Sequence, residues 1–161
     1  MSKASNAQMV SPRFETGKPI LIAGLKTRYS QQTRAEIPAH WHGFVPYIGQ
    51  VPDQVNGVAY GVCWNFDSDG NFDYLTGVEV SRVSDLAPGF SHVMVPGSRY
   101  AVFTHSEHAS ALPNTIQAIW CDWRPTSGRE IADSPSFERY GEKFDPQTGT
   151  GDIEIWVPVK E

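Results

Sequence analysis

The chain has 161 residues, of which 40% are hydrophobic and 19% are charged, and its formal net charge is −5 at pH 7. This length and composition predict one globular domain, or two very small ones, and exclude a disordered chain. The acidic excess argues against direct nucleic-acid binding, which needs a basic face. The longest apolar run, around residues 20–25, is too short for a membrane span or a secretory signal. We therefore expect a cytoplasmic protein without a membrane partner.

The first half of the chain predicts a strand, a helix and a hairpin. Residues 1–16 are polar and aperiodic, which indicates a flexible N-terminal tail before a single domain at 17–161. Residues 18–29 are predicted as a strand, and large apolar residues recur at helical spacing over residues 37–48. In that helix Pro38 suits the first turn, and Pro46 should kink or shorten the end.

Turn residues divide the chain after this helix. The predicted strands at 58–66 and 72–83 are joined by a turn at 67–71, which makes a hairpin. Residues 88–97 have Pro-Gly at both ends and are predicted as a connector.

The same order of elements then appears again. Residues 99–105 are predicted as a strand, residues 112–123 as a helix, and residues 137–144 and 152–159 as two more strands. Adding 75 to the five apolar positions of the first helix reaches five apolar positions of the second, and the same shift aligns Glu79 with Glu154. The matched helix positions are Ile37, Trp41, Phe44, Val45 and Ile48 with Leu112, Ile116, Ile119, Trp120 and Trp123.

This repeat predicts an α+β fold. Two strand-helix-strand-strand modules, at about 18–85 and 97–160, would form antiparallel sheets related by pseudo-two-fold symmetry. A central cleft between the two halves is a common place for a ligand.

Metal and cofactor motifs are weak in this chain, and we expect neither. His40 and His42 are two apart on the predicted helix and cannot chelate one ion together. The turn at 67–73 resembles a calcium loop but has its glycine at the wrong position and no glutamate at the twelfth. The two cysteines, Cys63 and Cys121, are expected to be reduced and buried.

Aromatic residues near acids are the remaining functional signal, since 12% of the chain is aromatic. Aromatic walls around a buried carboxylate can hold an organic cation, because the ring faces attract the charge and the carboxylate neutralises it. Side chains two apart on a strand share a side. The candidate ligand-binding residues are Trp41, Tyr60, Trp64, Glu79, Glu138, Tyr140, Glu154 and Trp156. The alternative stays open that these aromatics are core residues and these glutamates face water.

The second half of the chain carries a family resemblance. The sequence FERY at 137–140 and the ending IEIWVPV at 153–159, together with YAVFTH at 100–105, resemble the GyrI-like family, also called the AraC-type effector-binding domain. The first half resembles it through FDYLTGVEV at 72–80. The resemblance implies two strand-helix-strand-strand modules with a small-molecule pocket between them, as in multidrug-sensing transcription regulators.

The resemblance also ranks the candidates. Glu138 matches the acid of the family's F-E-x-Y step and is the first choice for the counter-charge, with Tyr140 beside it, whereas Glu79 and Glu154 are second choices. It implies a stand-alone member, similar to gyrase-inhibitory proteins and to proteins carried on integron cassettes. We expect a protein that binds amphipathic cations or drugs without chemistry. The alternatives are a hydrolase of reactive cyclopropane compounds that uses a pocket glutamate, and a protein-interaction module with a protein partner or as a homodimer.

Overall fold

The computed structural model describes residues 11–83 and 85–160. One eight-stranded antiparallel sheet runs through them in the order β1-β6-β8-β7-β3-β4-β2-β5. The strands are β1 (Arg13–Thr16), β2 (Ile20–Tyr29), β3 (Gln54–Trp64), β4 (Phe72–Val80), β5 (Phe90–Val95), β6 (Arg99–His105), β7 (Ser136–Tyr140) and β8 (Ile153–Val159). The α+β class predicted from the sequence is confirmed.

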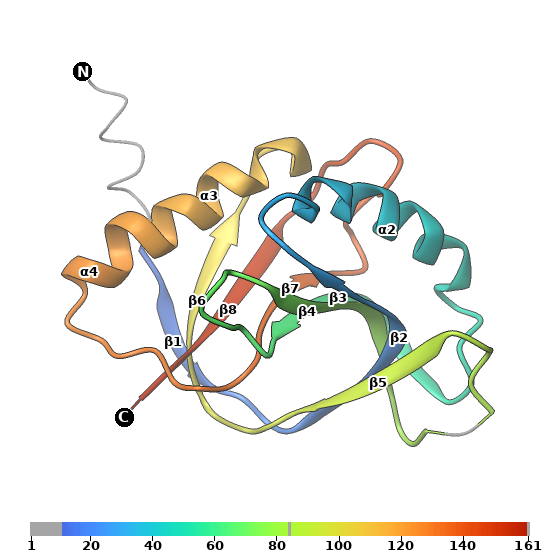
Figure 1. Cartoon of the computed structure of the whole chain (residues 1–161). Coiled ribbons are helices and arrows are strands. Elements are labelled where there is room, and N and C mark those ends of the chain that lie inside the picture. The colour runs from blue at the N-terminus through green and yellow to red at the C-terminus, as the bar shows by residue number, and fades with distance from the viewer. Residues whose placement is uncertain (1–10, 84, 161) are drawn as a thin grey trace.

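Two helical stretches cover one face of this sheet (Figure 1). The helical segments are η1 (Arg34–Glu36), α2 (Ile37–Phe44), η2 (Val45–Tyr47), η3 (Ala109–Ala111), α3 (Leu112–Ala118), the π-helical η4 (Ile119–Trp123) and α4 (Arg124–Thr126). As expected from Pro46, the first helix changes to a 3₁₀ turn after Phe44. None of the described helices has the length and apolar composition needed to cross a lipid bilayer.

Each helix packs its apolar stripe on its own half of the sheet. Phe44 of α2 packs with Ala23 and Val78, whereas Ile119 packs with Phe103 and residues of β8. Cys121, expected to be buried, is exposed, and the neighbouring Ile119 is the residue of η4 that is fully buried.

The two halves exchange their outer strands, which corrects two predictions. β1 pairs with β6 of the second half, and β5 pairs with β2 of the first half. Part of the predicted tail is therefore a strand, and the remaining residues 1–10 lie outside the described residues. The predicted connector at 88–97 contains β5, so its Pro-Gly steps bracket a strand. Both strands are short, and their partners are distant in the sequence, so local periodicity is a weak guide to them.

The predicted duplication is present, but its spacing is not constant. Helices α2 and α3 begin at Ile37 and Leu112, which keeps the predicted shift, whereas β4 and β8 begin at Phe72 and Ile153, which is a larger shift. The connection between β7 and β8 is longer than the turn between β3 and β4, and this displaces the last strand. The predicted match of Glu79 with Glu154 is therefore wrong, because the shift that aligns the starts of these two strands places Glu79 on Lys160.

A second core lies on the sheet face opposite the helices. Residues from both halves meet there, among them Ile22 and Val95 from one side and Tyr100 and Val102 from the other. The sheet is curved (Figure 1), and this core contains side chains from both modules.

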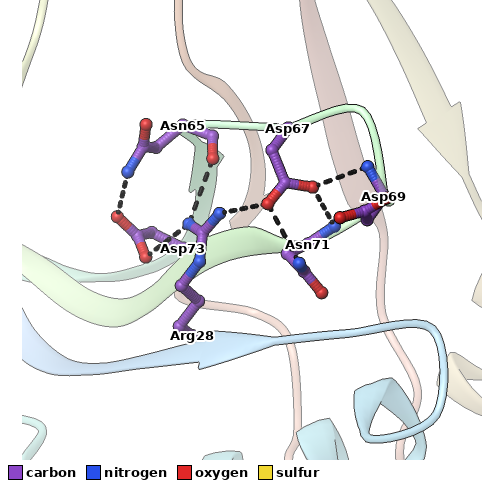
Figure 2. A network of polar contacts seen from close by, with 6 residues as sticks. All are labelled: Arg28, Asn65, Asp67, Asp69, Asn71 and Asp73. Atoms are coloured by element: carbon purple, nitrogen blue, oxygen red, sulfur yellow. Dashed lines mark hydrogen bonds and ion pairs between the residues drawn. The ribbon is translucent and has the colours of Figure 1, made fainter.

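The predicted hairpin of β3 and β4 is confirmed, and a polar network organises its turn (Figure 2). Asp67 accepts hydrogen bonds from the backbone N–H groups of Asp69 and Asn71 at 2.9 and 3.0 Å. Arg28 of β2 donates to Asp67 at 3.0 Å and to the buried Asp73 at 3.1 Å. This network fixes the start of β4, where Asp73 directly precedes Tyr74.

Acid should weaken this turn. Hydrogen bonds from Asn71, followed by others from Asp69 and Arg28, lower the pKa of Asp67 from 3.8 to about 2. A depressed pKa means that its stabilisation is present above pH 3.8 and is lost as the pH falls through about 2. We expect Asp67→Asn to reduce the acid-induced loss of unfolding free energy between about pH 4 and pH 2, measured by urea unfolding with tryptophan fluorescence. Asp69→Asn is the matched control, and an equal effect of both variants would contradict this role of Asp67.

Candidate ligand-binding site

Glu138 lies near the middle of the sheet, on the face that carries the helices. Side chains alternate along β7, so Phe137 joins the opposite core, while Glu138 and Tyr140 point toward α2 and α3. In register, Glu138 stands opposite Gly61 on β3 and Ile155 on β8. It therefore sits at the junction of the two halves.

Two tyrosines donate hydrogen bonds to the same oxygen of this carboxylate. The Tyr140 hydroxyl is 2.8 Å from Glu138 Oε1, and the Tyr74 hydroxyl is 3.0 Å from it. Tyr140 is two residues along the same strand, whereas Tyr74 reaches over from β4. Desolvation raises the pKa of both phenols well above 10, which keeps them protonated as donors.

Glu138 is partly desolvated by its neighbours but is not fully buried. Burial raises the pKa of its carboxyl above the ordinary 4.5, and the hydrogen bonds from Tyr140 and Tyr74 oppose that rise. The side chain is nevertheless only half-buried, so it keeps contact with solvent. The ionised form of a carboxylate in this situation is stabilised by a positive charge placed beside it.

Helix α2 holds the tyrosines in place through two consecutive residues. Trp41 Nε1 donates to the Tyr74 hydroxyl at 2.8 Å, and the Trp41 ring packs edge-on against Tyr140 with centroids 4.7 Å apart. The His40 ring lies edge-on to Tyr74 at 5.7 Å. His40 Nε2 is 2.8 Å from the Leu25 carbonyl, which can only accept, so Nε2 carries the proton and Nδ1 accepts from Tyr29 at 2.7 Å. Burial lowers the pKa of His40, which favours this neutral form.

Gly61 provides the space through which Tyr74 reaches Glu138. A Cβ atom at position 61 would lie 2.2 Å from the Tyr74 hydroxyl and 2.9 Å from Glu138 Oε1. Any side chain on this central position of β3 would therefore displace the phenol from the carboxylate. The absence of a side chain is a requirement of the site.

The structure brings together three of the eight predicted residues, namely Trp41, Glu138 and Tyr140. The others are on the opposite face of the sheet. Tyr60 and Trp156 pack in the opposite core, Trp64 packs against its edge, and Glu79 pairs with the core residue Ile22 in register.

Glu154, also on that opposite face, is already neutralised. It accepts from Arg13 at 2.9 Å and lies 3.9 Å from Arg139. A cavity of about 370 Å³ opens beside it, with Arg139, Lys143, Asp152 and Glu154 in its lining. Both positively and negatively charged side chains line this cavity, and Glu138 is not among its lining residues. The cavity is therefore a poor match for a cation site.

Tyr74, Gly61 and Cys63 belong to the site and are absent from the prediction. Cys63 stands opposite Tyr74 in register and beside Glu138, and burial raises the pKa of its thiol, so it is a neutral thiol there. The predicted hairpin put Tyr74 and Cys63 on neighbouring strands. The register of β3 against β4 and β7, which no local pattern specifies, was needed to place them at Glu138.

None of the described residues forms a metal centre. No group of three or more His, Cys, Asp or Glu among residues 11–83 and 85–160 could hold an ion. His105, for example, is bonded to Thr115 at 2.7 Å and to the His108 carbonyl at 2.9 Å.

Comparison with known families identifies the family to which this chain belongs. The GyrI-like small molecule binding domain matches residues 11–160. The chain belongs to the GyrI-like family. This confirms the resemblance seen in the FERY segment and in the last strand.

Relatives of this GyrI-like domain include a transcriptional regulator and proteins of known structure. The transcriptional regulator BrlR of Pseudomonas aeruginosa is 28% identical over 121 residues, which is 74% of this chain and 44% of the regulator, so the chain spans less than half the length of that relative. The structure of SAV2435 bound to tetraphenylphosphonium has a TM-score of 0.75 at 21% identity, covering 93% of this chain and 94% of that one. The integron cassette protein VCH_CASS2 of Vibrio cholerae has a TM-score of 0.70 at 16% identity, covering 94% and 97%. These likenesses confirm the fold.

The raised pKa of Glu138 predicts a loss of stability with rising pH. Its folded pKa lies above the ordinary 4.5, so its contribution is fully present below that pH and is lost as the pH rises through the folded value. Glu138→Gln keeps an oxygen for the two tyrosines but does not titrate. We expect the unfolding free energy of the wild type, relative to Glu138→Gln, to fall between pH 4 and pH 8 in urea unfolding. A constant difference across this range would contradict the assignment.

Gly61→Ala should disrupt the site. Its Cβ would force Tyr74 away from Glu138, and overpacking of this kind costs typically about 1–3 kcal/mol. Gly43→Ala on α2 is the matched control, because nothing lies within 4 Å of its Cβ position and alanine favours a helix by about 1 kcal/mol. Urea unfolding should show the first variant destabilised and the second unchanged or stabilised. Equal stability of Gly61→Ala and the wild type would show that Tyr74 is free to move.

Proposed function

We propose that this GyrI-like protein binds amphipathic organic cations at Glu138 and acts by sensing or sequestration, without chemistry. The observation that carries the proposal is a half-buried carboxylate with a raised pKa, which accepts hydrogen bonds from Tyr74 and Tyr140, the two tyrosines that Trp41 contacts. A positive charge next to this carboxylate would relieve the cost of its desolvation.

Aromatic rings would supply most of the affinity. Burying about 200 Å² of ligand surface contributes about 5 kcal/mol before the costs of association. Trp41 and Tyr140 are partly exposed aromatic residues close to the carboxylate, whereas Tyr74 is buried beneath the surface. Ring faces attract cations by about 0.5–2 kcal/mol each. The carboxylate would then select for charge, while the rings accept ligands of varied shape.

The comparisons support this proposal from two sides. The neighbour SAV2435 was solved with tetraphenylphosphonium, a lipophilic cation, on the same fold. BrlR is a transcriptional regulator, which is consistent with a sensing role for domains of this family. Sequestration requires binding alone and is the simplest activity that this site supports.

A hydrolase is the second candidate, and the raised pKa of Glu138 favours it. A carboxylate whose pKa is raised and which is bonded to two phenols has the properties of a general acid or base. Incubation with a reactive small molecule and detection of product separates turnover from binding, since a binding protein returns its ligand unchanged.

Tetraphenylphosphonium tests the proposal directly. We expect saturable binding to the wild type, measured by quenching of tryptophan fluorescence, and at least about 30-fold weaker binding to Glu138→Gln, because loss of a desolvated charge partner costs about 2 kcal/mol or more. Triphenylphosphine oxide, a neutral compound of similar shape, should bind both proteins alike.

Glu79→Gln is the matched control, because it makes the same substitution on the other face of the sheet. It should bind tetraphenylphosphonium as the wild type does. No binding by the wild type, or equal losses in the two variants, would contradict the role of Glu138.

A further inference from the structure

The two oxygens of Glu138 are not equivalent. Oε1 accepts from both Tyr74 and Tyr140, at 3.0 and 2.8 Å. Oε2 has no hydrogen-bond partner among the described residues, yet it is not one of the buried polar atoms without a partner, which are Thr76 Oγ1 and Ser134 Oγ. Oε2 therefore keeps contact with solvent, from which it can accept hydrogen bonds.

The donors that surround Glu138 are already engaged. Trp41 Nε1 donates to the Tyr74 hydroxyl, and each tyrosine hydroxyl has its single proton on Oε1. Cys63, another neighbour of Glu138, offers only a weak S–H donor. When a ligand covers Glu138 and removes the water, a replacement donor for Oε2 has to come from the ligand.

Cations differ in whether they can supply that donor. A protonated amine places an N–H on Oε2 and forms a charge-assisted hydrogen bond, whereas a quaternary ammonium or a phosphonium has no N–H and leaves Oε2 desolvated and unpaired. A site built to bond a ligand N–H discriminates against an analogue that lacks it, because the protein's own polar group is then left without a partner.

We propose that this site prefers cations with an N–H at the charged centre, that is protonated amines or amidines, over quaternary cations of the same skeleton. The inference rests on the proposed cation binding and adds the chemical class of the ligand. Oε2 of Glu138 is the atom that makes the distinction.

A matched pair of probes tests this preference. The probes are (1-naphthylmethyl)dimethylammonium, which carries one N–H, and (1-naphthylmethyl)trimethylammonium, which has a methyl group in its place. We expect calorimetric titration at pH 7 to show the first binding the wild type at least about tenfold more tightly. The quaternary probe is the less strongly hydrated of the two, so easier desolvation cannot produce this order.

Glu138→Gln identifies the atom responsible. Its amide oxygen can accept from the two tyrosines, which leaves an NH₂ group where Oε2 was, and this group cannot accept from the ligand. The affinity ratio of the two probes should therefore fall to about one in this variant. A ratio that persists in Glu138→Gln would assign the preference to the size of the extra methyl group and would overturn the inference.

The remaining outcomes separate this inference from the proposed function. If tetraphenylphosphonium and both naphthyl cations bind in a Glu138-dependent way but with equal affinities for the naphthyl pair, cation binding stands and the N–H preference is wrong. If the wild type binds none of the three probes, the proposed cation binding is wrong, and the N–H preference falls with it.

Discussion

The pairing of β3 with β7 is the constraint on which the candidate site depends. It joins the two halves of the sheet and sets Gly61 opposite Glu138. The missing side chain at position 61 lets Tyr74 reach from β4 to a carboxylate on β7, so residues from both halves meet at one oxygen. A shift of one residue in this register would move Glu138 to the other face, because side chains alternate along a strand.

The two halves share a framework but have different chemistry. In each half, a residue at a strand end bonds a residue of the helix above it, Tyr29 with His40 in the first half and His105 with Thr115 in the second. The shift that relates the starts of the two helices also relates Cys63 to Glu138, and these two residues lie on the same face of the two central strands. The fold thus offers two related positions at its centre, and only one carries a charge. That asymmetry gives the site a single counter-ion.

The opposite face shows how charge can be present without forming a cation site. Glu154 lies within reach of Arg13 and Arg139, so its charge is already compensated by the protein. Among residues 11–83 and 85–160, the hydrogen-bond donors to Glu138 are two uncharged phenols, those of Tyr74 and Tyr140. The protein's donors to Glu138 carry no positive charge, so its ionised form is not compensated by a neighbouring cation, which is the physical difference between the two glutamates.

Much of this protein follows from its sequence alone, because periodicity and turn residues are local signals. The helix at Ile37, the hairpin of β3 and β4, the repeated order of elements and the pair of Glu138 and Tyr140 on one strand side were all predicted in this way. Only the tertiary structure decided which face of each strand the helices cover and that β1 and β5 pair with strands of the other half. It also decided that Tyr74 contacts Glu138, whereas Glu154 lies on the opposite face. The two-residue alternation of side chains divides a strand into two faces but does not show which face the helices cover. The register between distant strands depends on contacts that no local pattern encodes.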